Sequence, residues 1–254
     1  MRERPILLNG DMVRAILDGR KTVTRRLVPS WQLPTETSQA DGDKFRWMSV
    51  AQRDPRWGFG VFGATEAECM AQYNEDGPRC CPFGNEGDRL WVRENWWQAG
   101  EWQSCYPMVD ECVWHGGSRV FYSADGVPPN EPNRHFPSGA PKGYTAADPD
   151  VVWRHRPSIH MPRWASRILL EVTAVRVERL QDITEEQAIA EGIDLDALAD
   201  AQDRYDMVLA GSGADGRATP ITAFRDLWNS TGGDWDANPW AWVIEFKRVE
   251  AAHA

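Results

Sequence analysis

The sequence predicts an α+β protein: a small β-barrel of short strands with flanking helices and long loop-rich insertions. Short segments rich in Val, Thr, Leu and Ile recur from one end of the chain to the other, whereas few segments have helical spacing. Two stretches, at about 29–86 and 97–150, lose this periodicity and are rich in Gly, Pro and Trp. The 254 residues show no internal repeat and no clear linker, so we expect one domain, 1–254, that carries both insertions.

The N-terminal segment predicts a strand, a helix and a second strand. Residues 6–8 form a short apolar run that suits a strand. Residues 11–17 have apolar side chains on one helical face, with Asp11 as the expected cap. Gly19 suits a helix end, and residues 22–28 are rich in Thr and Val, which favours a strand.

The strands and helices expected after residue 86 are also indicated by alternation and by capping patterns. Residues 87–94 and 168–180 alternate apolar and polar side chains, as strands do, and residues 119–123 suit another short strand. Thr184 to Gln187 has the pattern of a capping box, so a short helix should follow and end at Gly192. The remaining expected elements are a helix over 194–209, a helix over 221–228 and a closing strand over 240–249.

Composition limits the class of protein and its partners. Hydrophobic residues make up 42% of the chain, which excludes a disordered or collagen-like protein. The net charge is -10, whereas proteins that hold long nucleic acids usually carry a surplus of Lys and Arg. A small substrate, or a locally basic pocket, fits this charge better.

The cysteines and the N-terminus bear on location. The N-terminus is charged at once and does not resemble a signal peptide, and no apolar run approaches the roughly 18 residues of a membrane span. An odd number of cysteines then favours reduced thiols in a cytoplasm. We expect a cytoplasmic protein, not attached to a membrane, without a metal or another cofactor. The five cysteines are Cys69, Cys80, Cys81, Cys105 and Cys112.

The segment Gly-Arg-Lys-Thr-Val-Thr-Arg-Arg, residues 19–26, is the first candidate for chemistry. A threonine hydroxyl becomes a nucleophile when a base takes its proton, and a lysine whose charge is disfavoured can be that base. Thr22 and Thr24 share one face if the strand is regular, and Lys21 lies at the turn, from which it can fold toward them. Nearby arginines could disfavour the lysine charge. The alternative is a solvated basic turn before an edge strand.

The second candidate is the most basic window, residues 153–167, which contains four arginines, two histidines, two tryptophans and no acid. Arginine binds phosphate, and aromatic faces stack on bases, so this window suits recognition of a nucleotide-like substrate. The alternative is that these arginines pair with the abundant acids and that the tryptophans fill a core.

Two weaker signals remain. Arg93, Glu94 and Trp96 stand at the end of an apolar strand, where they would line a barrel mouth or form an ordinary strand end. Glu191 precedes the expected helix stop, where a carboxylate is unfavourable for the helix dipole. Such a placement calls for a functional role or for a compensating cation.

Together these pieces resemble the ASCH domain family of the PUA-like superfamily. The resemblance covers three blocks: residues 5–26, residues 87–96, and residues 158–192 with the final strand. The form with Cys-Pro-Phe-Gly-Asn-Glu-Gly-Asp-Arg-Leu-Trp-Val-Arg-Glu, residues 81–94, looks like a group common in phages and prophages. The resemblance implies a PUA-like barrel with a pocket for a nucleoside or nucleotide.

One branch of that family hydrolyses N4-acetylcytidine and is similar in the Gly-Arg-Lys-Thr-x-Thr segment. The resemblance implies Lys21, Thr24 and Glu191 as catalytic residues, with Glu185 and Glu186 as competitors for the acidic role. We expect Thr24 to attack the acyl carbon and Lys21 to accept its proton, or water to attack with Glu191 as base. The alternatives are a module that binds RNA or modified nucleic acid and a ribonuclease that acts on single strands. The residues expected to bind substrate are Arg93, Glu94, Trp96, His160, Arg163 and Trp164.

Overall fold

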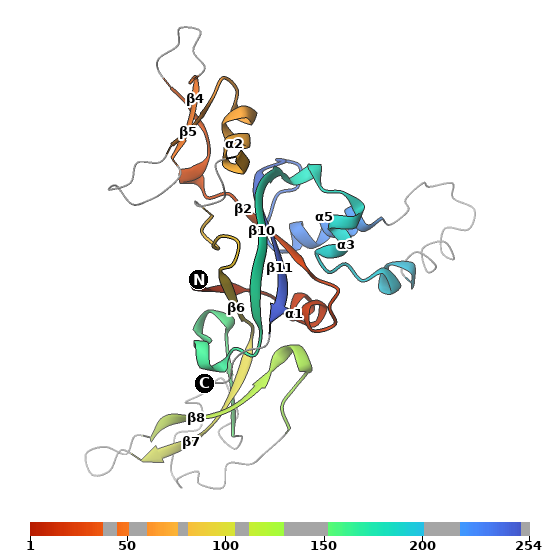
Figure 1. Ribbon diagram of the computed structural model, residues 1–254. Coiled ribbons are helices and arrows are strands. Elements are labelled where there is room, and N and C mark those ends of the chain that lie inside the picture. The colour runs from red at the N-terminus through yellow and green to blue at the C-terminus, as the bar shows by residue number, and fades with distance from the viewer. Residues whose placement is uncertain are drawn as a thin grey trace. The chain divides into compact units, whose positions relative to one another are not determined.

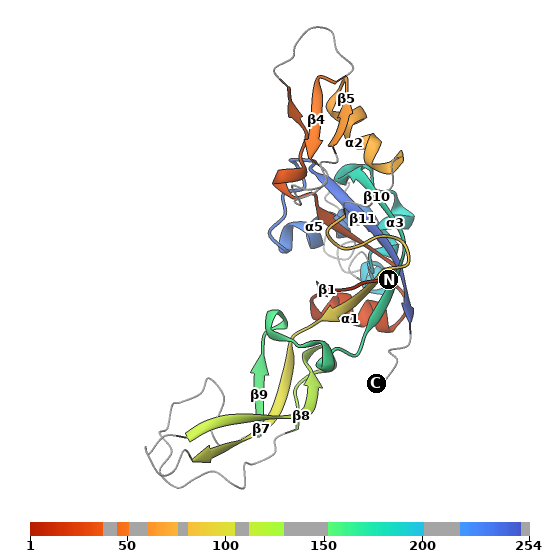
Figure 2. The same cartoon turned by 60° about the vertical axis from the view of Figure 1, so that its left-hand side comes forward.

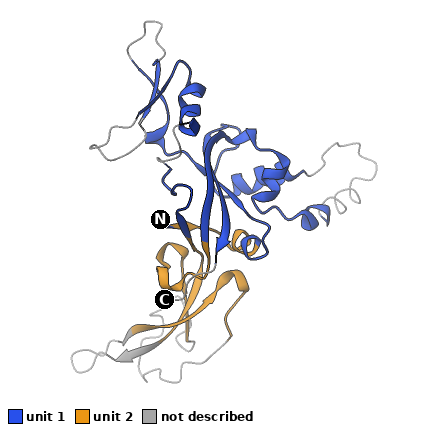
Figure 3. Cartoon of the chain, in the orientation of Figure 1, with its two compact units in different colours: residues 1–4, 15–90, 170–249 blue, residues 5–14, 91–169, 250–254 orange. Residues whose placement is uncertain are grey.

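The computed structural model describes residues 1–37, 45–50, 60–75, 81–104, 112–129, 152–200 and 219–249 (Figure 1). These residues form three sheets and few helices, so the α+β class is confirmed. The chain divides into two compact units (Figure 3). Unit 1 comprises residues 1–4, 15–90 and 170–249, and unit 2 comprises residues 5–14, 91–169 and 250–254. The first predicted insertion falls in unit 1 and the second in unit 2.

The largest sheet has the strand order β1-β6-β10-β11-β2. β1 and β2 stand at the two ends of this order, so the described strands form an open sheet and not the closed barrel that the sequence predicted. Closure would need a ladder of hydrogen bonds between those two edge strands. The strands are β1 (Glu3–Leu7), β2 (Val23–Leu27), β6 (Arg89–Arg93), β10 (Leu169–Arg179) and β11 (Trp240–Val249).

Four helices have defined bounds, and three of them follow the sequence pattern. The helix predicted at the N-terminus is present, but Asn9 Oδ1, and not Asp11, accepts the capping hydrogen bond, from Met12 N at 2.9 Å. The helix predicted over 194–209 is described only over 195–200, and its remaining residues lie outside the described ranges. The four are α1 (Gly10–Leu17), α2 (Glu66–Glu75), α3 (Glu185–Ala190) and α5 (Pro220–Ser230).

Helices cover both faces of the β2–β11 pair in unit 1. Arg25 lies opposite Val243, and Trp242, the next residue of β11, directs its side chain to the other face because strand side chains alternate. The guanidinium of Arg25 lies 5.9 Å from the ring centre of Phe224 on α5. The ring of Trp242 lies 5.6 Å from that of Tyr73 on α2. Unit 1 therefore has a core on each face of this pair.

The first insertion is more ordered than the sequence predicted. It contains β3 (Thr35–Glu36), β4 (Trp47–Val50), β5 (Gly60–Gly63) and α2, with β3, β4 and β5 in one sheet. The sequence pattern missed α2 because only Cys69, Met70 and Tyr73 are buried along its ten residues. The insertion packs on β10: Asn74 Nδ2 donates to Val177 O at 3.0 Å, and Val177 N donates to Asn74 Oδ1 at 2.7 Å.

Unit 2 contains a three-stranded antiparallel sheet in the order β8-β7-β9 (Figure 2). Its strands are β7 (Trp96–Ser104), β8 (Cys112–Tyr122) and β9 (Trp153–Arg156). The short strand predicted over 119–123 is the end of the eleven-residue β8. Trp96, Met161 and Ala165 form a buried cluster against this sheet. Of the predicted insertion at about 97–150, residues 105–111 and 130–150 lie outside the described residues.

Candidate functional site

Lys21 is held at the entrance to β2 by the turn that follows α1. Gly19 has a φ of +78°, a backbone conformation that glycine adopts without steric cost, and its N–H donates to Ile16 O at 3.1 Å. Lys21 N then donates to Ala15 O at 3.0 Å. This tight turn directs the lysine side chain inward, where it is fully buried.

Glu191 is positioned by the short helix α3. Thr184 and Gln187 form the predicted capping box at its start, and Glu191 is the C-terminal cap. Gly192 follows with a φ of +98°. A carboxylate at this end of a helix is electrostatically unfavourable, and the structure supplies the compensating cations from β2 and the turn before it.

Lys21 and Glu191 form a buried ion pair within unit 1. Lys21 Nζ donates to Glu191 Oε2 at 2.6 Å, to Glu191 O at 2.8 Å and to Val23 O at 2.8 Å. The side chains of the pair are 0% and 2% exposed, respectively. A lysine ammonium has three N–H groups, so this geometry uses all of them.

Arg25 is the third member of this cluster. From the sequence, it was predicted only to be one of the cations near Lys21. Arg25 Nη1 lies 3.4 Å from Glu191 Oε1. Its other terminal nitrogen donates to Gln187 Oε1 at 2.7 Å and lies 3.3 Å from Glu178 Oε2. The sequence signal for a role of Arg25 was its position in the same segment as Lys21. That signal could not reveal a partner 166 residues away.

Burial controls the charge of Lys21. Removal from water lowers the pKa of this amine, and Glu191 opposes that effect by favouring the ammonium. Arg26 and Arg25 add to the lowering because they repel a second positive charge. The sequence predicted that arginines of this segment would disfavour the lysine charge. Arg26 and Arg25 both act in that direction, although burial is the larger cause of the lowered pKa.

Thr24 is also buried in unit 1, but it is not one of the three acceptors of Lys21 Nζ. It pairs in register with Ile244 of β11. Because side chains alternate along a strand, Thr24 leaves β2 on the face opposite to that of Arg25. Lys21 and Glu191 are therefore in direct contact, whereas a hydrogen bond between Lys21 and Thr24 is not formed in this conformation.

Glu185 and Glu186, the competitors for the acidic role, lie in the first turn of α3 and are exposed. Glu191 lies at the other end of this helix. Among the described contacts, Lys21 contacts Glu191 and neither of the other two glutamates. The contact supports the assignment of Glu191 to the acidic position.

The second group of candidates lies in unit 2, around Glu94. Arg167 Nε lies 3.0 Å from Glu94 Oε1, and Arg167 Nη2 lies 3.1 Å from Glu94 Oε2, which is a two-pronged contact. Arg167 also binds Asp125 and stacks on the ring of Tyr122 at 3.9 Å. Burial raises the pKa of Glu94, although Arg167 works in the opposite direction.

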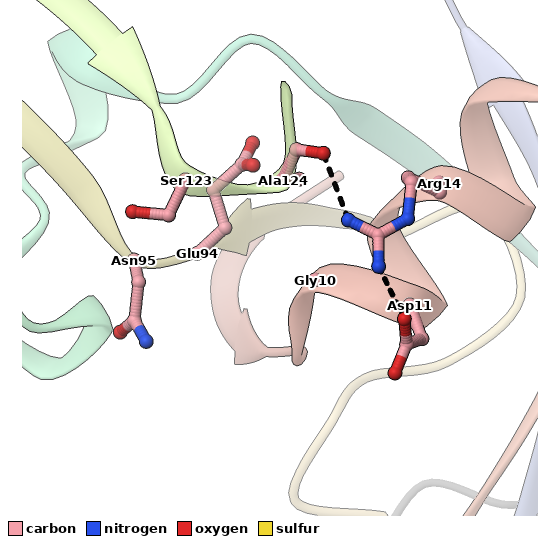
Figure 4. Close-up of a pocket in the computed structure, with 7 residues that line it drawn as sticks. All are labelled: Gly10, Asp11, Arg14, Glu94, Asn95, Ser123 and Ala124. Carbon is pink, nitrogen blue, oxygen red and sulfur yellow. Dashed lines mark hydrogen bonds and ion pairs between the residues drawn. The ribbon is translucent and has the colours of Figure 1, made fainter. Parts of the chain in front are cut away.

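Glu94 borders a cavity of about 260 Å³ in unit 2 (Figure 4). Arg14 crosses one side of it, where Arg14 Nη1 donates to Ala124 O at 2.8 Å and Nη2 contacts Asp11. The lining is mostly polar. It consists of Gly10, Asp11, Arg14, Glu94, Asn95, Ser123 and Ala124.

The two tryptophans expected to bind substrate differ in access. Trp96 is 2% exposed and belongs to the buried cluster, so its faces are closed to a ligand in this conformation. Trp164 is 57% exposed and packs edge-on against Trp96, with ring centres 5.9 Å apart. Trp164 is therefore the stacking surface that this part of unit 2 offers.

The remaining candidates lie close to these in the sequence. Arg93 stacks on Trp91 at 5.4 Å and donates to the backbone oxygen of Ile159. His160 ends the 3₁₀ turn η3 (Ser158–His160) and is exposed. Arg163 begins the turn η4 (Arg163–Ala165) and is partly exposed.

The described ranges contain no group of three His, Cys, Asp or Glu side chains placed to hold a metal ion. Cys69 and Cys81 are free and buried, whereas Cys80 and Cys105 lie outside the described ranges. None of the described helices is both long and apolar enough to cross a bilayer. Comparisons with family models, curated proteins and solved structures found no match to this chain. The resemblance to the ASCH family therefore rests on the residue motifs alone.

Proposed function

We propose that this protein is an ASCH-like, PUA-like amidohydrolase that removes the acyl group from N4-acetylcytidine or a related N4-acylated nucleoside. The observation that carries the proposal is the buried contact of 2.6 Å between Lys21 and Glu191, in the segment that resembles the deacetylating branch of the family. A lowered pKa of Lys21 supports the same role, because it makes release of the ammonium proton easier and so favours the form that can accept a proton.

The chemistry follows from amide cleavage. Lys21 is an ammonium in this geometry, so it must first release one proton, which its lowered pKa favours. Thr24 Oγ1 then attacks the acyl carbon while the Lys21 amine accepts the hydroxyl proton, and Glu191 orients the amine. The bond from the acyl carbon to N4 then breaks, and N4 takes the proton from Lys21. Water hydrolyses the acyl-Thr24 ester and releases the carboxylic acid. This route requires Thr24 and Lys21 to approach each other when substrate binds, as catalytic hydrogen bonds often tighten in the complex. In a second route, water attacks directly and Glu191 acts as the base.

The test is hydrolysis of N4-acetylcytidine and N4-benzoylcytidine, followed by chromatography of released cytidine. We expect turnover by the natural chain and loss of at least about 100-fold in Lys21→Ala and Glu191→Gln, the scale of a lost acid–base group. Lys247→Ala is the matched control, because this exposed lysine pairs with Glu171 at 2.8 Å in the same unit. Absence of turnover by the natural chain on both nucleosides would refute the proposal.

Thr24→Ala and a trapping experiment separate the two routes. Rapid acid quench of a single turnover, followed by peptide mass spectrometry, should show an acyl group on Thr24 if the hydroxyl is the nucleophile. Full activity of Thr24→Ala together with no acyl-enzyme would instead assign the attack to water.

A further inference from the structure

Two arginines on β9, Arg154 and Arg156, lack an ion-pair partner among the described contacts. No carboxylate lies within ion-pair distance of either guanidinium in the part of the chain that the structure describes. By contrast, Arg167 in the same unit contacts both Glu94 and Asp125. Acidic residues outnumber Lys and Arg by 38 to 28 in this chain, so two neighbouring arginines without acidic partners are unexpected. Such a pair favours an anionic ligand.

The strand register places both guanidinium groups on one face of the unit 2 sheet. Arg156 lies opposite Trp96 on β7, and Arg154 lies opposite Gln98. Residues two apart on a strand share a face, and so do residues directly opposite each other in an antiparallel pair. Burial, together with repulsion between the two arginines, lowers the pKa of Arg156.

An exposed aromatic side chain adjoins the same face. The ring of Trp164 packs against Trp96 at 5.9 Å, and Trp96 is the cross-strand neighbour of Arg156. Trp164 is 57% exposed, so its indole is open to a planar ligand. The acids of the adjoining segments, Glu94 and Asp125, are already bound to Arg167.

We propose that this face, the Arg154–Arg156–Trp164 surface, binds single-stranded nucleic acid. Arg154 and Arg156 contact backbone phosphates, and an unstacked base lies against Trp164. A duplex would keep its bases stacked, so an exposed indole favours a single strand. A phosphate-containing ligand without bases would use the two arginines and leave Trp164 without a role. The surface belongs to unit 2, so this proposal stands independently of hydrolysis at Lys21 in unit 1.

The test is fluorescence anisotropy of a fluorescein-labelled eight-nucleotide RNA, titrated with the full chain at several potassium chloride concentrations. Arg154→Gln with Arg156→Gln should weaken binding and reduce the slope of log affinity against log salt by about 1.4, or about 0.7 for each phosphate contact. Trp164→Ala should weaken binding by roughly 5- to 100-fold and leave the slope unchanged. Trp164→Phe should retain most of the affinity, because a phenyl ring still stacks.

Arg225→Gln is the matched control, since Arg225 is an exposed arginine beside Asp226 on α5 of unit 1. Far-ultraviolet circular dichroism of each variant checks folding, and the same oligomer as DNA and inorganic polyphosphate serve as competitors. Displacement of the labelled RNA by the DNA oligomer, together with weaker RNA binding by Trp164→Ala, supports the proposal. Absence of binding at low salt, equal weakening by Arg225→Gln, or RNA binding that is unaffected by Trp164→Ala overturns it. Hydrolysis of free N4-acetylcytidine should be unchanged in Arg154→Gln/Arg156→Gln, so failure here and failure of the hydrolase proposal are distinguishable.

Discussion

Replacing Lys21 by methionine should strongly destabilise unit 1. The substitution keeps the length of the side chain but removes the ammonium from the buried pair. The Glu191 carboxyl group would remain almost wholly buried, with Arg25 at 3.4 Å as its remaining cation among the described contacts. The carbonyl oxygens of Val23 and Glu191 would also lose a donor each. Removal of one partner from a buried ion pair costs about 3–5 kcal/mol, so the free energy of unfolding should fall by that amount.

The double variant Lys21→Met/Glu191→Gln supplies the decisive comparison. It removes both charges together, so its loss of stability should be smaller than the sum of the two single losses, by about 0.5–3 kcal/mol. Urea unfolding at pH 7, followed by tryptophan fluorescence and by circular dichroism, measures each free energy. Lys247→Met controls for the loss of a lysine at an exposed pair. Additive losses, or a Lys21→Met protein as stable as the natural chain, would refute the reasoning.

The pH dependence of the same variant gives a second measurement. The unfolded chain keeps the Lys21 proton up to the ordinary pKa of 10.5, whereas the folded chain releases it at a lower pH because burial lowers the pKa. Between those two values the unfolded state binds more protons, so the free energy of unfolding should rise with pH. Lys21→Met should lack this rise. An identical pH profile for both proteins would show that Lys21 is not buried as described.

Three further predictions rest on single side chains. Burial raises the pKa of the Cys69 thiol to about 11, so iodoacetamide at pH 8 should leave this thiol unmodified until urea unfolds the chain. Peptide mass spectrometry measures the alkylated fraction of Cys69, and rapid labelling of the folded protein would contradict the prediction. Thr184→Ala removes the cap of α3 and should cost about 1 kcal/mol, measured by urea unfolding against Thr184→Ser, which should retain most of the stability. Gly192→Ala adds a Cβ 2.8 Å from that of Ala15 at a φ of +98°, so it should cost about 1–2 kcal/mol or more, and a fully stable variant would contradict this turn geometry.

Local signals predicted most elements of unit 1. The closing strand was predicted over 240–249 and is observed as Trp240–Val249, because alternation and length both favour a strand there. The capping box at Thr184 was equally visible, since its two hydrogen bonds join residues only three apart. The carboxylate at Glu191 was recognised as unfavourably placed, and this predicted either a functional role or a compensating cation.

Features that depend on distant contacts could not be predicted in the same way. The contact between Arg25 and Glu191 joins side chains 166 residues apart, and no local pattern selects that arginine among three in its segment. The open order of the largest sheet depends on which strands pair, which periodicity does not encode. The helix α2 was missed because its buried side chains are too few to produce a clear apolar face. The edge-on contact of Trp164 with Trp96 likewise depends on the turns between β9 and β10.

The hydrogen bonds between Asn74 and Val177 also bear on aggregation. β10 has eleven residues whereas β6 has five, so β10 extends past the neighbour that covers its edge. An uncovered strand edge is a template for pairing with strands of other molecules. Asn74 occupies both the donor and the acceptor of Val177, as a neighbouring strand would. Because this contact uses the backbone of Val177, it tolerates changes of the valine side chain. The inserted segment therefore covers this part of the β10 edge, and we expect it to hinder pairing with a strand of a second copy.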